Sequence, residues 1–356
     1  MTVVTKKKRV PSLDAIRTLA ILLVIITHTS DSSYQYNNNE LALMISPAER
    51  IFALAIHVFG RCGVPLFLFL TGYLVLSKQF NTAEDIKKFY KTHVLPLIIT
   101  CSIWGIIYYI TGLIVYKRPC SIIRLLLELL FFNNYEGSQF WYIPCIVGIY
   151  IFIPFVSMTI RNIDKKFMII PLLSLIYISI PATLDPILSA IKSQYQLYSI
   201  ADLSWSGGQY GILVLIGYLI SQTGINKNIR KWAIVTGIIS FSFALWEENF
   251  CFTHLYAYDI WYINIAIICV SISIFIIILS NNKIKSNKII TWISKNSFGI
   301  YLVHNLFRDY FSMLFEEISY FRKFILLFTL VTFCSILLVW ILGLNKKIAR
   351  IMMNCK

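Results

Sequence analysis

A basic residue and a histidine share one face of the first apolar segment of this chain. Arg17 and His28 lie in the run SLDAIRTLAILLVIITHTS. At about 100° per residue their spacing returns both side chains to nearly the same side of a helix, roughly 16 Å apart along its axis. Ionisable side chains in a membrane span are costly unless they face protein or water. The pair is therefore a candidate site in which Arg17 binds an anion and His28 acts as a base. The alternative is an interfacial anchor and a structural histidine.

A second segment, GRCGVPLFLFLTGYL at residues 60–74, combines an arginine with helix-weakening residues. Arg61 begins a span whose Gly63, Pro65 and Gly72 would break or thin a helix. Membrane proteins tolerate such breaks where the freed backbone lines a cavity or meets a neighbouring helix. A kink that serves only packing, with Arg61 at the outer interface, is the simpler interpretation.

Two further segments carry polar or aromatic residues inside apolar runs. In FWYIPCIVGIYIFIP, Trp141 and Tyr142 stand at the start of a span, where an aromatic belt at the membrane surface would also explain them. In SKNSFGIYLVHNLFRDY, His304 and Arg308 are spaced i, i+4 and share a helix face. A second stripe of this kind strengthens the case for a polar site inside a helix bundle.

The composition predicts an all-α, polytopic membrane helix bundle. Hydrophobic residues make up 58% of the 356 residues and charged residues only 14%. Apolar runs close to the roughly 20 residues of a spanning helix recur along the whole chain. About ten transmembrane helices are predicted, at 12–30, 56–77, 93–115, 139–160, 167–181, 208–222, 232–247, 260–280, 297–314 and 322–344. The stretch Ser121–Phe132, with Arg124 and Glu128 spaced i, i+4, instead predicts a helix on the membrane surface.

The basic residues orient this bundle with both termini inside. Cytoplasmic loops collect Lys and Arg, and this layout puts most of the 32 basic residues on the inner side. Residues 1–11 and 345–356 are then cytoplasmic tails of a single membrane domain, 1–356. The net charge of +15 indicates affinity for anionic membrane lipids and gives no indication of nucleic-acid binding.

The eight cysteines are scattered without metal-ligand spacing, so neither a metal site nor a disulfide framework is predicted. The first span lacks a cleavage site and is expected to stay attached. No oligomeric state is assigned.

Taken together, the four segments resemble the acyltransferase type 3 family of integral membrane acyltransferases. The family's D-x-x-R element and its later histidine match Asp14, Arg17 and His28. Its second-span motif matches Arg61, Val64, Pro65, Leu66, Phe67, Thr71, Gly72 and Tyr73. A later W-Y segment matches Phe140, Trp141, Tyr142, Tyr150 and Pro154. The motif S-x-G-I-Y-x-x-H matches Ser297, Gly299, Ile300, Tyr301 and His304. The resemblance runs in order from residue 12 to the last span.

One family element is missing. Members often carry Arg-x-x-Arg just before the third span's proline, where this chain has Tyr90 and His93. Lys87, Lys88 and Lys91 would supply positive charge there, although a lysine lacks the bidentate fork of arginine. No fused hydrolase-like or racemase domain is expected beside the membrane domain.

The resemblance implies an acetyl-CoA-dependent O-acyltransferase of the bacterial plasma membrane. It would move an acyl group, acetyl or another such as succinyl, from cytoplasmic acyl-CoA to a hydroxyl of a cell-envelope polysaccharide or lipid-linked sugar. Acyl-CoA is then a substrate, and no tightly bound cofactor is expected. A transporter or flippase built on the same bundle is the alternative, because polar groups in broken helices also serve transport.

The resemblance also implies roles for individual residues. His28 would act as general base or carry the acyl group, with Arg17 assisting and Asp14 orienting Arg17. The residues expected to bind the donor are Arg17, Arg61, Lys87, Lys88, Lys91 and His93. Those expected to bind the acceptor are Trp141, Tyr142, Tyr73, His304 and Arg308. Outer-loop residues able to hydrogen-bond or stack on sugars are expected to be Tyr34, Tyr36, Asp185, Asp202, Trp205, Glu247 and Glu248.

Overall fold

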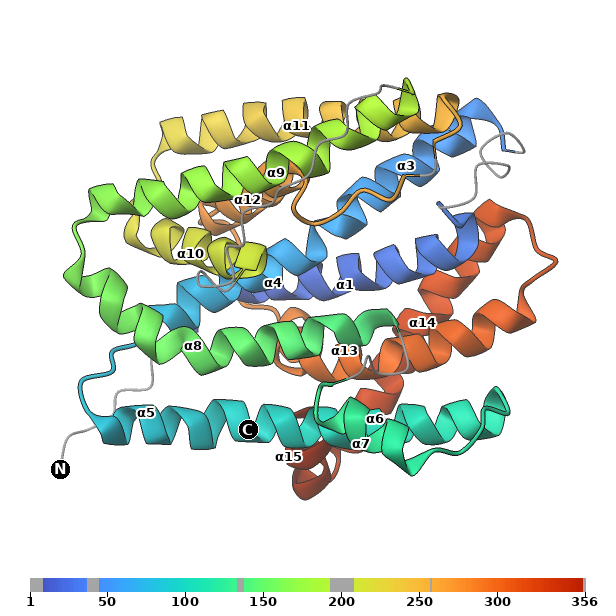
Figure 1. The fold of residues 1–356 in the computed structure, drawn as a ribbon, viewed down its shortest axis with the longest axis horizontal. Helices are drawn as coiled ribbons and strands as arrows, with labels where there is room; N and C mark the ends of the chain where they lie inside the picture. Colours follow the sequence, from blue (N-terminus) through green and yellow to red (C-terminus); the bar gives the residue numbers. More distant parts are fainter. Residues whose placement is uncertain (1–8, 37–44, 133–137, 193–207, 257, 355–356) are drawn as a thin grey trace.

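The computed structural model describes residues 9–36, 45–132, 138–192, 208–256 and 258–354. In these ranges every regular element is a helix (Figure 1). The α-helices are α1 (Pro11–Tyr34), α3 (Pro47–Arg61), α4 (Gly63–Thr71), α5 (Ala83–Phe89), α6 (Leu95–Val115), α7 (Ile122–Leu129), α8 (Tyr142–Asn162), α9 (Ile169–Ala190), α10 (Gly208–Gln222), α11 (Lys227–Thr253), α12 (Ile265–Leu279), α13 (Lys288–Leu314), α14 (Tyr320–Gly343) and α15 (Lys346–Met353). Short π-helical turns are η1 (Gly72–Leu76) and η2 (Tyr90–Val94), and short 3₁₀ turns are η3 (Ser138–Trp141) and η4 (Lys165–Met168).

Each of the ten predicted spans falls on a helix of the structure. Within the described residues, seven helical segments are long and apolar enough to cross a membrane. The apolar helices α10 and α12 are shorter, with 15 residues each, whereas α13 has 27 residues but a more polar sequence. The all-helical, multi-pass class is confirmed, while the count of ten and the inward-facing termini stay predictions.

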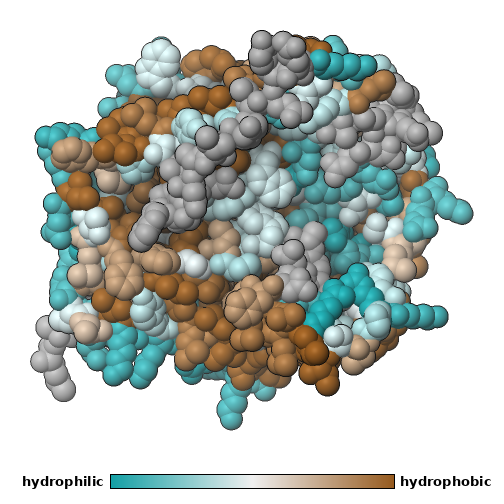
Figure 2. All heavy atoms as spheres, in the orientation of Figure 1, coloured by the Kyte–Doolittle hydropathy of each residue, from teal (hydrophilic) through white to brown (hydrophobic). Residues whose placement is uncertain are grey.

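Helix α1 occupies the centre of the bundle (Figure 1). It contacts α3, α4, α12, α13 and α14. Its apolar side chains Ile16, Ala20, Ile21 and Ile25 are fully buried. The peripheral helices instead leave large apolar side chains exposed. Figure 2 shows apolar residues over much of one face, with many hydrophilic residues along its left and right edges. Such an apolar surface is what lipid contact requires.

The second predicted span is divided into α3, α4 and η1. Glycines let its second half, α4 and η1, approach the backbone of α10. A Cβ atom on Gly72 would lie 1.8 Å from the carbonyl oxygen of Val214, and one on Gly217 would lie 2.0 Å from that of Phe69. Helices α4 and α10 therefore touch backbone to backbone, as small residues permit in membranes. The packing interpretation of this segment accounts for Gly72.

The surface-helix prediction for Ser121–Phe132 is confirmed as a helix. Helix α7 occupies most of that range, and Arg124 Nε donates to Glu128 Oε1 at 2.9 Å across one turn. The pair holds a carboxylate that is itself buried.

Two residues expected in outer loops are instead buried in a helix. Glu247 and Glu248 are 0% exposed because α11 continues to Thr253, beyond the predicted end at residue 247. Glu247 accepts hydrogen bonds from Asn264 and Tyr258, whereas Glu248 pairs with His57. A buried carboxylate needs such partners, so these residues stabilise contacts between segments.

Other outer-loop expectations also change. Asp185 lies within α9, which continues to Ala190 rather than ending at residue 181. Tyr34 and Tyr36 are buried, at 2% and 5% exposure, so their rings are not free to stack on a sugar. Asp202 and Trp205 lie outside the described residues.

Candidate active site

The first turns of α1 carry a buried carboxylate held by three donors. Asp14 accepts hydrogen bonds from Arg9 Nε at 2.5 Å, Arg9 Nη2 at 2.7 Å and Ser294 Oγ at 2.7 Å. Arg17 Nη1 is 4.0 Å from Asp14 Oδ1 and donates to Ser294 Oγ at 3.3 Å. The expected pairing of Asp14 with Arg17 is therefore present as a long ion pair, while Arg9 is the closer partner. Among the described residues Arg17 makes no other hydrogen bond, which leaves most of its N–H donors for a ligand.

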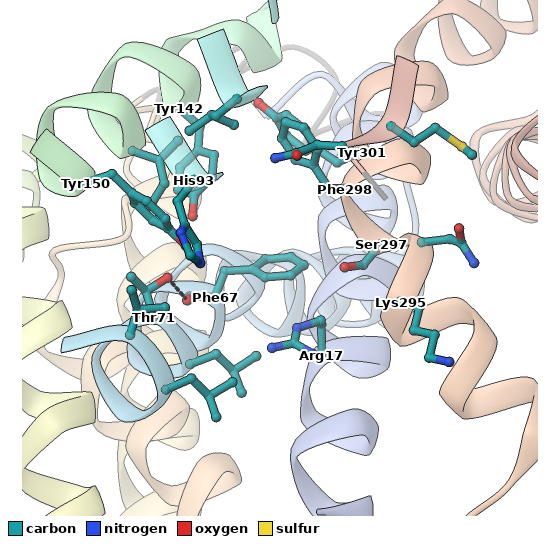
Figure 3. Close-up of a pocket in the computed structure, with 18 of the residues that line it drawn as sticks. Arg17, Phe67, Thr71, His93, Tyr142, Tyr150, Lys295, Ser297, Phe298 and Tyr301 are labelled. Carbon is teal, nitrogen blue, oxygen red and sulfur yellow. Dashed lines mark hydrogen bonds between the residues drawn. The ribbon is translucent and has the colours of Figure 1, made fainter. Parts of the chain in front are cut away.

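Arg17 points into a cavity of about 630 Å³, the first cavity (Figure 3). Its walls come from α1, α4, α8, α13 and the segment around η2. Among its lining residues are Arg17, Phe67, Thr71, His93, Tyr142, Tyr150, Lys295 and Tyr301. Cationic side chains thus stand beside aromatic and apolar ones. This combination suits a ligand with both an anionic and an apolar part.

His28 lies beyond the wall of this cavity, one helical turn after the lining residue Val24. It is 8% exposed and its ring lies 5.2 Å, centroid to centroid, from that of His304, which is fully buried. His304 Nδ1 is 2.6 Å from the carbonyl oxygen of Tyr301. Because a carbonyl only accepts, Nδ1 carries the proton and the neutral ring has a bare Nε2. That Nε2 is buried and has no hydrogen-bond partner in the described part of the chain.

Aromatic rings connect the cavity with the histidine pair. Tyr301 lines the cavity and its ring lies 5.8 Å from that of His304. Tyr142 also lines the cavity and contacts Tyr301 edge-on at 5.9 Å. Tyr301 therefore links the lining of the first cavity to the histidine pair.

Near the other end of α1, five charged residues, Asp31, His57, Arg61, Glu248 and Asp259, form a cluster here called the charge cluster. His57, Arg61 and Glu248 are buried, and Asp31 and Asp259 are half-buried. Arg61 is 3% exposed and donates Nε–H to His57 Nε2 at 3.1 Å. Its Nη2 forms an ion pair with Asp259 and lies 3.8 Å from Asp31 Oδ2. His57 Nδ1 is 2.6 Å from Glu248 Oε1. Breaking one member of such a buried network leaves an uncompensated charge, which costs about 3–5 kcal/mol.

Asp259 lies in the connection between α11 and α12 and remains charged. Burial acts to raise its pKa, but the adjacent His57 and the charge of Arg61 outweigh burial and hold the pKa at about 2. The pairing of Arg61 with this carboxylate therefore persists across the physiological pH range.

Four aromatic residues, the aromatic cluster, lie beside the charge cluster. The Trp141 ring is 5.2 Å from that of Tyr210, 5.7 Å from that of Trp261 and 5.4 Å from that of Tyr262. Trp261 Nε1 donates to the Tyr210 hydroxyl at 2.9 Å, and the Arg61 guanidinium lies 5.4 Å from both the Trp261 and Tyr262 ring centres. Trp261 is 36% exposed, so part of this cluster is open to a ligand.

The structure divides the residues expected to bind a donor. Arg17 and His93 line the first cavity, and Lys91 lines a neighbouring one. Lys87 and Lys88 are exposed on α5 and line neither, and Lys87 lies 3.9 Å from Glu84. Their expected contact with a donor therefore has no support in this geometry.

Arg61 is also absent from both cavity walls. Its guanidinium is taken up by the charge cluster and by the Tyr262 hydroxyl at 3.3 Å. A role in binding donor phosphates does not fit this placement, because the first cavity lies at the Arg17 end of α1. We assign Arg61 instead to holding the connection between α11 and α12 against α3.

The residues expected to bind an acceptor are likewise separated. Trp141 belongs to the aromatic cluster, whereas its neighbour Tyr142 lines the first cavity. Tyr73, in η1, packs against Phe275 of α12, and Arg308 forms an ion pair with Asp309. His304 contacts His28 and is thus placed with the candidate base.

Several residues of the site were not predicted from the sequence. Arg9 is the main partner of Asp14, although it was assigned only to a basic tail. Lys295 lines the first cavity from α13, two positions before the matched Ser297. Met353 lines it from α15. The amphipathic pattern KKIARIMM was the available signal for α15.

Spanning helices around a cavity with a cationic wall, next to two buried histidines, define a multi-pass membrane protein with an internal polar site. A family model described as an acyltransferase domain matches residues 10–344. The chain therefore belongs to the acyltransferase type 3 family that its motifs resemble, and acyl transfer is the reaction class that this membership supports. Comparisons with curated proteins and with solved structures each gave no match.

Proposed function

We propose that this protein transfers a short acyl group, acetyl in the simplest case, from cytoplasmic acyl-CoA to a hydroxyl of a cell-envelope polysaccharide or lipid-linked sugar. The observation that carries the proposal is the position of the His28 and His304 pair beside a cavity into which Arg17 points. A base next to a site for an anionic donor is the minimum that such a transfer needs. The family membership supports the same reaction class.

The donor enters the first cavity. Its volume of about 630 Å³ lies in the usual range of ligand sites, roughly 300–1,000 Å³. Arg17 offers unused N–H donors to phosphate or to the amide carbonyls of the donor, and His93 stands on the opposite wall. Phe67, Tyr142 and Tyr150 provide apolar contact for the pantetheine arm. The roughly 16 Å of helix between Arg17 and His28 requires a donor that is long and extended.

The chemical step places the proton on His28. Its neutral imidazole takes the proton of the acceptor hydroxyl while the hydroxyl oxygen attacks the thioester carbonyl carbon. The carbon–sulfur bond then breaks, the thiolate of CoA leaves and takes up the proton held by His28, and the acyl group remains on the acceptor as an ester. The bare Nε2 of His304 accepts a hydrogen bond from the acceptor or from the His28 ring and so orients them. General-base catalysis of this kind contributes about 10²–10⁴ in rate.

The acceptor binds on the other side of the histidine pair, at the aromatic cluster. Trp141 and Trp261 present large, partly exposed rings on which a sugar ring stacks, and the hydroxyl of Tyr210 is close by. The apolar helices that surround the site fit a multi-pass protein of a bacterial plasma membrane, with the donor reaching it from the cytoplasm.

Consumption of acyl-CoA tests this function directly. Purified protein in lipid nanodiscs is mixed with acetyl-CoA and with envelope glycans from cells lacking the gene, and release of free thiol is followed together with glycan mass. We expect thiol release and a mass gain of one acetyl group per modified sugar. A transporter or flippase would move its substrate without consuming acetyl-CoA, so the absence of both signals would favour that alternative.

A further inference from the structure

A second cavity of about 920 Å³ adjoins the first. Four residues, Thr92, Asn296, Met353 and Asn354, line both. The two spaces are therefore neighbours that share a wall at the end of α15. A single extended ligand could occupy both.

Four cations gather on the second cavity: Lys91, Lys346, Lys347 and Arg350. None of them lies within ion-pair distance of a carboxylate in the part of the chain that the structure describes. The indoles of Trp292 and Trp340 line the same space. Cations with no acidic partner attract a polyanion, and indole faces stack on a heteroaromatic ring.

The structure fixes the basic face of α15 in place. Thr100 Oγ1 donates to the carbonyl oxygen of Ile351 at 2.8 Å, and Trp104 Nε1 donates to that of Met352 at 2.7 Å. Met353 is 2% exposed and packs against Gly299 of α13. The helix is thus docked on α6 and α13 rather than free in solvent. It also lies after residue 344, where the match to the family model ends.

We propose that the second cavity binds the phosphorylated nucleotide half of acyl-CoA, while the first cavity holds the pantetheine arm and the acyl group. This inference rests on the proposed function. The adenosine 3′-phosphate and the diphosphate of CoA together carry several negative charges, which the four cations neutralise, and its adenine offers a ring for Trp292 or Trp340. Placing the phosphates at α15 leaves the arm to run past Arg17 toward the histidine pair.

Binding of CoA to charge-neutralised variants tests the assignment. The protein is placed in nanodiscs of neutral phosphatidylcholine, and CoA and 3′-dephospho-CoA are titrated by calorimetry. The triple variant Lys346→Gln, Lys347→Gln, Arg350→Gln should bind CoA at least about tenfold more weakly and discriminate less between the two ligands. Lys91→Gln tests the same cavity from another segment, in case the triple variant loosens α15.

The matched control neutralises three exposed cations outside both cavities, Lys227→Gln, Arg230→Gln, Lys231→Gln at the start of α11. It should bind CoA as the wild type does. If the triple variant and Lys91→Gln both keep the wild-type affinity for CoA, the assignment is overturned. If in addition less anionic phospholipid copurifies with the triple variant, a lipid phosphate is the occupant.

A failure of the proposed function gives a different result. In that case the wild-type protein itself neither binds CoA nor consumes acetyl-CoA, and both proposals fall. A wild type that binds CoA, alongside variants with unchanged affinity, overturns only the assignment of the second cavity.

Discussion

The two histidine rings of the pair have different hydrogen-bond partners. A substitution of His28 therefore removes a different interaction from a substitution of His304. His304 is tied to the Tyr301 carbonyl through Nδ1, whereas His28 has only the ring contact with His304 in the described structure. His28 is therefore the ring with neither nitrogen tied to a backbone group in the described structure. His304 is the ring whose tautomer is set by a backbone group.

We predict that His28→Ala abolishes acyl transfer and leaves the protein folded. Alanine keeps helix propensity and removes the base, so turnover should fall by at least about 10²-fold. Thiol release and elution as a single membrane-protein peak measure the two parts. His254→Ala, at an exposed histidine that follows α11, is the control and should keep full activity. Near-normal turnover of purified His28→Ala would mean that the base is another group.

His304→Asn separates the two nitrogens of the second ring. An asparagine amide can still donate to the Tyr301 carbonyl, but it lacks Nε2. If Nε2 orients the reacting groups, kcat should fall by about 10-fold or more while the KM for acetyl-CoA changes little, because the donor site is intact. A role confined to helix packing predicts instead that His304→Asn matches the wild type in kcat after correction for the amount of folded protein.

Arg17→Ala should weaken donor binding, with Arg17→Lys restoring only part of it. Lysine returns the charge but not the planar fork that contacts Ser294 and a ligand together. A rise in KM for acetyl-CoA of about tenfold or more for alanine and less for lysine is expected in steady-state kinetics. Arg230→Ala, which is exposed and lines neither cavity, serves as the reference. Equal donor KM values for all four proteins would move the anion site away from Arg17.

Among the helices, the contact of α10 with α4 and the following turn η1 depends on two glycines, Gly217 and Gly72. We predict that Gly217→Ala destabilises the bundle, because its Cβ would collide with the Phe69 carbonyl oxygen; overpacking of this kind costs about 1–3 kcal/mol. Gly148→Ala is the control, since nothing lies within 4 Å of its added Cβ, and alanine favours the helix by up to about 1 kcal/mol. Thermal unfolding in detergent should show a lower midpoint for Gly217→Ala alone. Identical midpoints would mean that the two helices separate at little cost.

The positions of the helices follow from the sequence for a physical reason. Backbone groups in lipid must be satisfied within a helix, so each apolar run had to be helical, and the predicted ranges fall on α1 to α14. The ends of the helices are less well defined. The stretch that contains Glu247 and Glu248 looks like a loop by hydropathy, but partners distant in sequence, His57 and Asn264, keep it helical and buried.

Only the part of the site that lies on a single helix was predictable from the sequence. Periodicity placed Arg17 and His28 on one face of α1, and the structure keeps them in line with a cavity and a second histidine. Their partners lie far along the chain: Ser294 contacts Asp14 and Arg17, and His304 contacts His28. Spacing within a segment contains no information about which other helix packs beside it. For the same reason, the sequence did not reveal that Arg61 lies away from the first cavity.

For the molecule as a whole, sidedness is the outstanding prediction. With both termini inside, Lys87 faces the cytoplasm, and Glu316, in the connection before α14, faces outward. Both are exposed, so each can be changed to cysteine in a background where Cys120 and Cys355 are serine. An impermeant thiol reagent on intact cells should label Glu316→Cys but not Lys87→Cys, and both after permeabilisation. The opposite pattern would place the first cavity on the outer side and remove cytoplasmic acyl-CoA as its ligand.

An energised membrane stores work as ion gradients, and any continuous water path through a protein would discharge them. Tyr142 and Tyr301, whose rings lie 5.9 Å apart, line the first cavity beside the histidine pair, and three members of the charge cluster, His57, Arg61 and Glu248, are buried among their partners. In the proposed reaction, two bulky substrates meet at His28 from opposite sides and neither has to cross the bilayer. Only the acyl group would then change sides, so this arrangement would preserve the electrical insulation of the bilayer during turnover.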